Sequence, residues 1–145
     1  MPVGAFSIFD TAASALAAQR VRMDVIANNL ANANTAGRSG GEPYRRQVVV
    51  FAERATRATA PAPFAEAILP GGVDVVAVVP DDGPPRLVYD PGHPDADADG
   101  YVHLPNVNPM LELVDMISAT RAYEASVGLI SAARDVLAAA LDILR

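Results

Sequence analysis

The sequence predicts an α+β fold, mainly α, with two long terminal helices paired as a coiled-coil-like inner layer and a small β-rich centre. Apolar residues recur at helical spacing over residues 6–34 and again over 109–144. Most prolines and glycines, and several short strand-like runs, lie between these segments. We therefore expect residues 1–36 and 109–145 to form the helical domain and residues 37–108 the central domain.

The first helical segment repeats large apolar side chains every seven residues, which gives one apolar stripe suited to packing against another helix. Its stripe consists of Phe9, Leu16, Met23 and Leu30, with Ile26 beside them. The segment then becomes rich in asparagine, a residue that tolerates left-handed backbone and ends helices. The predicted exit turn contains Asn28, Asn29, Asn32, Asn34 and Thr35.

Short runs of β-branched residues in the middle predict three strands, over residues 44–51, 72–79 and 86–89. The turn-forming residues 80–85 between the second and third runs predict a hairpin. The Ala/Thr/Pro-rich residues 54–63 read as a mobile loop or linker, and residues 90–109 read as loop.

The last segment carries the strongest helical pattern. Seven-residue steps connect Met116, Tyr123, Ile130, Leu137 and Leu144, and the companion positions include Leu113, Val127 and Leu141. A helix over residues 109–144 would extend roughly 54 Å, which is long for so small a protein. Its stripe needs a partner, which the other terminal helix, a neighbouring molecule or both could supply. Assembly is therefore the leading hypothesis for function.

Composition excludes several function classes. The net charge of −6 gives no surface that would neutralise nucleic-acid phosphates. The chain has no cysteine, and hence no disulfide, thiolate metal site or cysteine nucleophile. No run of about 18–20 apolar residues predicts membrane insertion. The first nineteen residues lack a basic residue, so we expect no cleaved signal peptide.

One acidic loop supports an alternative function. Residues 95–99 alternate aspartate with alanine and precede Gly100, which matches the first half of a calcium-binding EF-hand loop. The twelfth loop position is Asn106 instead of the required glutamate. The alternative is thus a free-standing binding module with a divalent cation at Asp95–Asp99, although a solvated turn explains the pattern better. No nucleophile–base pattern is present, so we expect no enzyme, cofactor or metal.

Three strings of the sequence stand out, one at Ala27–Thr35, one in the centre at residues 89–108 and one at Met116–Ala125. Together they resemble the flagellar rod and hook protein family of bacteria. The central string most resembles the proximal-rod members and contains Tyr89, Asp90, Pro91, Gly92, His93, Pro94, Asp95, Gly100, Tyr101, Pro105 and Asn106. Ser126 stands where the family usually has asparagine.

The resemblance implies a structural subunit that assembles helically into the flagellar rod, the drive shaft that transmits motor torque across the periplasm. Implied partners are copies of the chain, other proximal and distal rod proteins, the junction protein at the rod base and the flagellar type III export apparatus. It also implies periplasmic placement after export without a cleaved signal peptide. The terminal helices would form the inner layer, and their apolar stripes would be the assembly interfaces.

Overall fold

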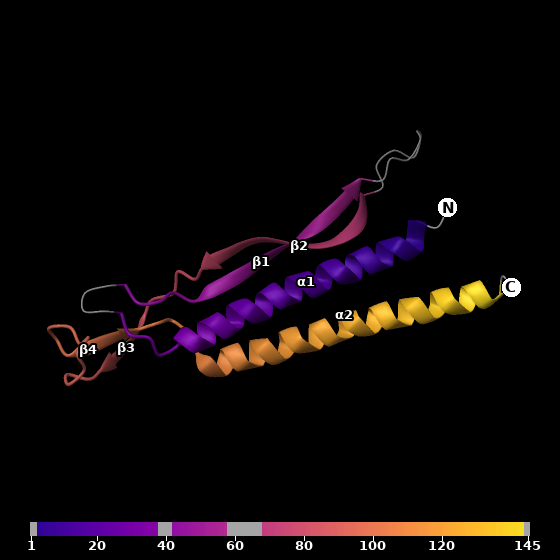
Figure 1. The fold of residues 1–145 in the computed structure, drawn as a ribbon. Coiled ribbons are helices and arrows are strands. Elements are labelled where there is room, and N and C mark those ends of the chain that lie inside the picture. Colours follow the sequence, from indigo (N-terminus) through magenta and orange to yellow (C-terminus); the bar gives the residue numbers. More distant parts are fainter. Residues whose placement is uncertain (1–2, 38–41, 58–67, 144–145) are drawn as a thin grey trace. The chain divides into compact units, whose positions relative to one another are not determined.

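The computed structural model describes residues 3–37, 42–57 and 68–143 (Figure 1). Two long helices, α1 (Val3–Asn32) and α2 (Pro109–Ile143), flank four strands in the sequence, which confirms the α+β, mainly α, fold class. The chain divides into two compact units that each draw on both helices. The first unit comprises Met1–Val21, Val50–Ala77 and Ala119–Arg145, and the second comprises Arg22–Val49 and Val78–Ser118. The expected division into helical and central domains stays a prediction.

Helix α1 ends within its asparagine-rich segment, as predicted. The Asn32 side-chain amide donates to the Asn28 carbonyl at 2.9 Å, and the Thr35 N–H donates to the Asn32 carbonyl at 3.0 Å. The second bond satisfies a carbonyl of the last turn that the helix would otherwise leave without a partner.

Helix α2 begins at a well-defined cap. The Asn108 side-chain oxygen accepts from the Met110 N–H at 3.0 Å, and Pro109 occupies the first helical position. Asparagine is among the best capping residues, and proline suits a position whose N–H has no helical partner. Among the described residues, neither helix is long and apolar enough to cross a membrane.

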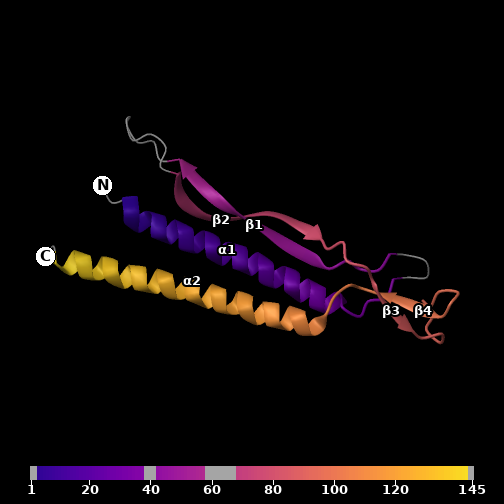
Figure 2. The same ribbon diagram turned by 180° about the vertical axis from the view of Figure 1, so that it is seen from behind.

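The strands form two separate two-stranded sheets, and the predicted hairpin is wrong. Strand β1 (Gln47–Arg57) pairs with β2 (Ile68–Pro80), and Figures 1 and 2 show these two running in opposite directions. Strand β3 (Arg86–Tyr89) pairs antiparallel with β4 (Tyr101–Leu104), from Arg86 opposite Leu104 to Tyr89 opposite Tyr101.

Contacts in the turn after β2 explain why no hairpin forms there. The Asp81 N–H donates to the Arg46 carbonyl at 2.7 Å, and the Asn106 amide donates to the carbonyls of Asp81 and Gly83. The turn is therefore bonded to two other segments, and β3 takes β4 as its partner. Residues 101–104, predicted as loop, are strand.

The predicted linker also needs correction. Strand β1 continues to Arg57, so residues 54–57 are strand, whereas 58–63 lie outside the described residues. The Arg54 guanidinium Nε donates to the Asp74 carboxylate of β2 at 2.9 Å, a cross-strand pair that extends the sheet beyond its β-branched run.

In the first unit, α1 and β2 approach closely because both have small residues at the contact. Ser14 of α1 is buried at this contact. Gly72 has a φ of +118°, and a Cβ there would collide with the Ser14 hydroxyl oxygen. That hydroxyl donates to the Thr11 carbonyl at 2.7 Å and accepts from the Val73 N–H at 3.1 Å. A glycine is therefore required at the crossing.

Candidate functional site

The end of α1 and the start of α2 meet through a partly buried polar cluster in the second unit. We call it the Arg46 cluster; its members are Asn29, Tyr44, Arg46, Asn106 and Glu112. Sequence reasoning identified Asn29 and Asn106 as family-motif residues, and the structure connects both of them to Arg46 or its neighbours. The cluster forms from four separate stretches of the chain.

Asn29 is 1% exposed and makes four hydrogen bonds. Its amide nitrogen donates to the Gln47 carbonyl at 2.8 Å and to Glu112 Oε2 at 3.0 Å. Its oxygen accepts from the Tyr44 hydroxyl at 2.8 Å and from the Gln47 N–H at 2.9 Å. Both donors and both acceptor positions of the amide are thus used inside the unit.

Glu112 is fully buried and is paired with a cation. The Arg46 Nε donates to Glu112 Oε1 at 2.6 Å, and Asn29 donates to the other carboxylate oxygen. A charge in this environment is tolerated only when it is paired and hydrogen-bonded. The pair therefore ties α2 to both α1 and the segment before β1.

Arg46 also holds the surrounding backbone and two more carboxylates. Its N–H donates to Asn106 Oδ1 at 2.8 Å, while its guanidinium lies 3.5 Å from Asp81 and 3.4 Å from Asp115. Arg22 on α1 approaches the same Asp115 carboxylate at 3.5 Å. Two arginines thus lie among three carboxylates around the helix ends, which leaves one net negative charge.

The electrostatics keep Arg46 charged and Tyr44 neutral. Desolvation lowers the pKa of Arg46, but hydrogen bonds and attraction from Glu112 and Asp81 outweigh it, so the pKa is raised overall. Burial raises the pKa of Tyr44, and the negative charge of Glu112 raises it further. The hydroxyl therefore remains a hydrogen-bond donor to Asn29 at neutral pH.

The sequence analysis missed Tyr44, Arg46 and Glu112. Glu112 stands four residues before Met116, on the face of α2 that carries the predicted apolar stripe. A carboxylate on such a face signals a buried partner, and this signal could have been used. The identity of that partner could not, because Arg46 lies 66 residues away in the chain.

The acidic loop is a hydrogen-bonded turn. The Asp97 carboxylate accepts from the N–H groups of Asp99 at 3.0 Å and Tyr101 at 2.8 Å, and it approaches His103 Nε2 at 3.2 Å. Within the described residues, no group of three or more His, Cys, Asp or Glu side chains could hold a metal ion. The divalent-cation alternative therefore receives no support.

The central family motif surrounds this turn. Tyr89 and Tyr101 face each other across β3 and β4 in an edge-to-face contact with ring centroids 5.2 Å apart. The Asp90 carboxylate accepts from the Gly92 N–H at 3.2 Å, and His93 Nδ1 accepts from the Asp95 N–H at 3.1 Å. Pro105 is fully buried. These motif residues shape the turn and the sheet.

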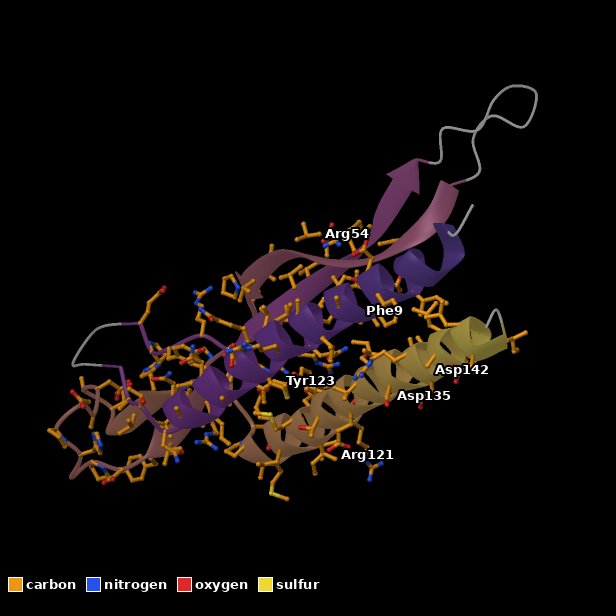
Figure 3. The ribbon with its side chains drawn as sticks, turned by 45° about the vertical axis from the view of Figure 1, so that its right-hand side comes forward. Phe9, Arg54, Arg121, Tyr123, Asp135 and Asp142 are labelled. Atoms are coloured by element: carbon orange, nitrogen blue, oxygen red, sulfur yellow. The ribbon has the colours of Figure 1, made fainter. Side chains whose placement is uncertain are left out.

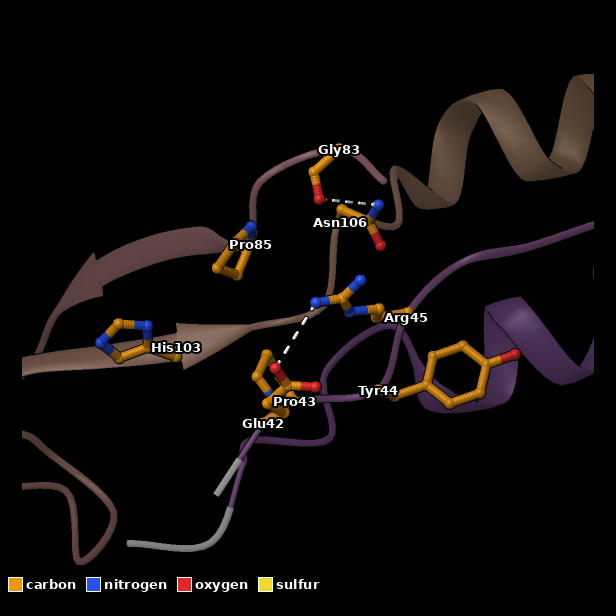
Figure 4. A pocket seen from close by; sticks show the side chains of 8 residues that line it. All are labelled: Glu42, Pro43, Tyr44, Arg45, Gly83, Pro85, His103 and Asn106. Carbon is orange, nitrogen blue, oxygen red and sulfur yellow. Dashed lines mark hydrogen bonds and ion pairs between the residues drawn. The ribbon is translucent and has the colours of Figure 1, made fainter. Parts of the chain in front are cut away.

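A cavity of about 270 Å³ with a mixed polar and apolar lining lies beside the Arg46 cluster in the second unit (Figure 4). The Glu42 carboxylate and the Arg45 guanidinium in its wall are 3.5 Å apart and offset each other's charge. The Asn106 amide in the wall donates to the Gly83 carbonyl at 3.2 Å. These polar groups are bonded to one another, so the cavity carries no ligand assignment.

The predicted packing positions are only partly covered. Ile26 is buried, whereas Phe9, Leu16, Met23, Leu30, Met116, Tyr123 and Ile130 are half-buried. Leu113, Val127, Leu137 and Leu141 are exposed. Leu144 lies outside the described residues. The pairing of α1 with α2 therefore leaves much of the apolar surface open, and its role between subunits stays a prediction.

An open apolar groove of about 320 Å³ lies between α1 and α2 in the first unit. Ile8 and Phe9 of α1 form one wall, and α2 contributes Leu129, Ala132, Ala133, Val136, Leu137 and Ala140. Figure 3 shows Arg121, Asp135 and Asp142 on the side of α2 away from α1. The charged side chains thus leave the groove apolar.

The first turns of α2 turn a polar face toward the Arg46 cluster and an apolar face toward solvent. Glu112 belongs to the cluster, and Asp115 lies 3.4 Å from the Arg46 guanidinium. Met110, Val114 and Ile117 are 70%, 62% and 55% exposed, at positions that share one face of the helix. This is the reverse of a helix that packs only within a soluble monomer.

Two family models match parts of the chain. A family model described as "Flagella basal body rod protein" matches residues 9–37. Another, described as "Flagellar basal body rod FlgEFG protein C-terminal", matches residues 98–143. The two matches include Asn29 and Glu112 but neither Tyr44 nor Arg46.

Full-length relatives share the same description, "Flagellar basal-body rod protein FlgC". The protein from Borreliella burgdorferi is 44% identical, with 99% of each chain covered. That from Bacillus subtilis is 43% identical over 96% of this chain and 97% of its own length. The Salmonella typhimurium protein is 41% identical over 94% of this chain and 96% of its own. The chain belongs to the flagellar basal-body rod protein FlgC family.

Proposed function

We propose that this chain is a structural subunit of the proximal rod of the bacterial flagellum. In this proposal copies of the chain assemble helically with other rod proteins into the shaft that transmits motor torque across the periplasm. Membership of the FlgC family supports the rod assignment. The observation that carries the assembly step is the apolar surface that α1 and α2 leave open, above all the groove of the first unit.

Burying that surface supplies the driving force for assembly. Each square ångström of apolar surface removed from water contributes roughly 25 cal/mol. Large obligate interfaces are more hydrophobic than transient ones, in keeping with the eight apolar residues that line the groove. A head-to-tail contact that does not close on itself generates a helical filament. In the filament, the terminal helices form an inner layer and the central segment lies outside it.

The partners follow from the same assignment. We infer contacts with further proximal and distal rod proteins and with the junction protein at the rod base. Delivery by the flagellar type III export apparatus, in an unfolded state and without a cleaved signal peptide, completes the proposal. Family membership supports assembly with other proteins of the flagellar rod and basal body.

Leu137→Asp tests the interface. It places a charge in the apolar groove, so we expect it to block rod assembly because an unpaired charge in a dry contact is costly. Ser131→Asp is the matched control, since residue 131 is an exposed polar position of the same helix that does not line the groove. Electron microscopy of basal bodies is the readout. Normal rods in cells with Leu137→Asp would show that the groove is not an assembly interface.

The gene deletion tests the function itself. We expect cells without the chain to keep the membrane-embedded base of the motor but to lack the rod and the ability to swim. Restoring the wild-type gene is the control. Intact rods and normal swimming after deletion would contradict the proposed function.

A further inference from the structure

We propose that the outer face of the sheet formed by β3 and β4 is a docking surface for a basic segment of another protein. We call it the tyrosine face; its members are Leu87, Tyr89, Tyr101 and His103. The partner presents arginine side chains, which stack on the tyrosine rings and pair with nearby carboxylates. This inference goes beyond rod assembly, because the tyrosine face contains no residue of either terminal helix.

The strand register places the four side chains on one side of the sheet. Successive side chains along a strand point to opposite faces. Leu87 lies opposite His103, and Tyr89 lies opposite Tyr101, so all four share a face. Val102, on the alternate face, is only 3% exposed, which identifies that face as the inner one. Leu87, Tyr89 and Tyr101 are 56%, 65% and 41% exposed. The tyrosine face is therefore open to solvent in the chain.

The two tyrosines are held in place before any partner binds. Their rings meet edge to face, with centroids 5.2 Å apart. Gly100 has a φ of +82°, and a Cβ there would lie 3.0 Å from the Tyr89 ring and 3.2 Å from Pro91 Cβ. The missing side chain at residue 100 thus leaves room for the ring. Aromatic side chains that are already fixed lose little conformational freedom on binding, and tyrosine and arginine are prominent among the residues that dominate interfaces.

Exposed carboxylates lie at the tyrosine end of this face. The Asp97 carboxylate lies 3.2 Å from His103 Nε2 and accepts from the Tyr101 N–H at 2.8 Å. Asp90 is the first residue after β3, and Asp99 is the second residue before β4. All three aspartates are exposed. A cation that stacks on a tyrosine ring therefore lies beside negative charge, which strengthens its attraction to the face.

The charge balance favours another protein over a second copy as the occupant. Residues 86–104 contain four aspartates and one arginine, and thus carry half of the chain's net charge of −6. That arginine, Arg86, belongs to the inner face and donates to Asn34 at 3.3 Å. The rest of the chain is also net negative, with thirteen acidic residues and ten arginines. Copies of the chain therefore repel one another at this face, whereas a segment with a surplus of arginine or lysine is attracted.

Titration of the full-length chain with a hexaarginine peptide, followed by nuclear magnetic resonance, tests the proposal. We expect amide shifts at residues 87–90 and 99–103, with an affinity that falls as salt is added. Hexalysine should bind at least about twofold more weakly, because a guanidinium stacks on a tyrosine ring better than an ammonium does. Shifts spread over acidic residues along the whole chain, or equal affinities for the two peptides, would contradict the proposal.

Matched variants separate the aromatic contribution from the charge. Tyr89→Leu should weaken hexaarginine binding by about two- to fivefold, whereas Tyr89→Phe keeps the ring and should leave the affinity unchanged. Asp99→Asn should also weaken binding by about two- to fivefold. Asp82→Asn removes the same charge from a side chain that is 96% exposed and lies outside residues 86–104, so it should change the affinity by less than about 1.5-fold. Equal effects of the two aspartate variants would mean that net charge alone attracts the peptide and would overturn the docking surface.

Photo-crosslinking in the cell tests the choice of partner. The photoreactive p-benzoylphenylalanine takes the place of Tyr89, and mass spectrometry identifies the residue to which it links. We expect a link to another protein, within a segment in which basic residues outnumber acidic ones. A link to a second copy, a link to a segment without that surplus, or the absence of any link in swimming cells would overturn the proposal. Rod formation is tested separately by the gene deletion, so either proposal can fail while the other stands.

Discussion

The two units use the same pair of helices in opposite ways. In the second unit a buried carboxylate and a buried amide meet an arginine, and directed hydrogen bonds specify the contact. In the first unit the helices face each other across an apolar groove of about 320 Å³. Directed polar bonds favour a single arrangement within one molecule, whereas open apolar surface favours association. One helix pair thus combines an internally fixed end with an end suited to a partner.

The largest expected effect comes from breaking the second unit at Arg46. Arg46→Met leaves Glu112 buried without its cation, which should lower the free energy of unfolding by about 3–5 kcal/mol. Arg45→Met should change it by less than about 0.5 kcal/mol, because its ion pairs are exposed. Urea unfolding followed by circular dichroism measures both. Equal losses would mean that burial at Arg46 has no special role.

The first unit can be broken at its close backbone approach. Gly72→Ala forces a Cβ into the Ser14 side chain at a backbone φ of +118°, so we expect a loss of about 1–3 kcal/mol. Gly128→Ala is the matched control, since a Cβ there has no other heavy atom within 4 Å. In the interior of α2 it should stabilise by about 0.5–1 kcal/mol. Urea unfolding measures both variants. A Gly72→Ala variant that is more stable than the wild type would contradict the close approach of Gly72 to Ser14.

The smallest expected effect is a loss of amide protection at low pH in the turn before β4. The hydrogen bond from the Tyr101 N–H holds the pKa of Asp97 below its usual 3.8; desolvation opposes this, while His103 and the Asp99 N–H lower it further. A lowered folded pKa contributes stability that is fully present above the unfolded value and is lost as pH falls through the folded value. We therefore expect protection of the Tyr101 amide to be constant between about pH 5 and 7 and to fall below about pH 4.

Matched variants make the acid effect specific. Asp97→Asn should flatten the pH dependence of Tyr101 amide exchange, because the titrating acceptor is gone. Asp99→Asn should leave it unchanged, because the Tyr101 N–H donates to Asp97. Amide exchange measured by nuclear magnetic resonance is the readout, and an unchanged acid response in Asp97→Asn would assign it to another group.

Much of the helical structure could be predicted from the sequence because it is encoded locally. The apolar spacing set the two helices, and asparagine and proline marked where they end and begin. The strand partners could not be predicted in this way. The turn at residues 80–85 resembles a hairpin locally, but its backbone is bonded to Arg46 and Asn106, which lie far along the chain.

The same distinction applies to the site. The family strings indicated Asn29 and Asn106, yet the residues that connect them are ordinary in sequence. Arg46 has a second arginine beside it, and only tertiary burial distinguishes the two. Periodicity identifies faces of a helix, whereas a polar network depends on which distant segments meet.

The bond between Asn29 and Glu112 spans 83 residues, which has a consequence for timing. Contacts between residues distant in sequence form late, because the intervening chain must first lose its freedom. In a chain that emerges from its amino end, α1 waits for its polar partner until residue 112 is outside. During that interval α2 has not yet joined α1, so a nearly complete subunit is the earliest species that can present the two helices in register. The hydrogen bonds between the helices would thus form only in a nearly complete subunit, because their residues lie far apart in the chain.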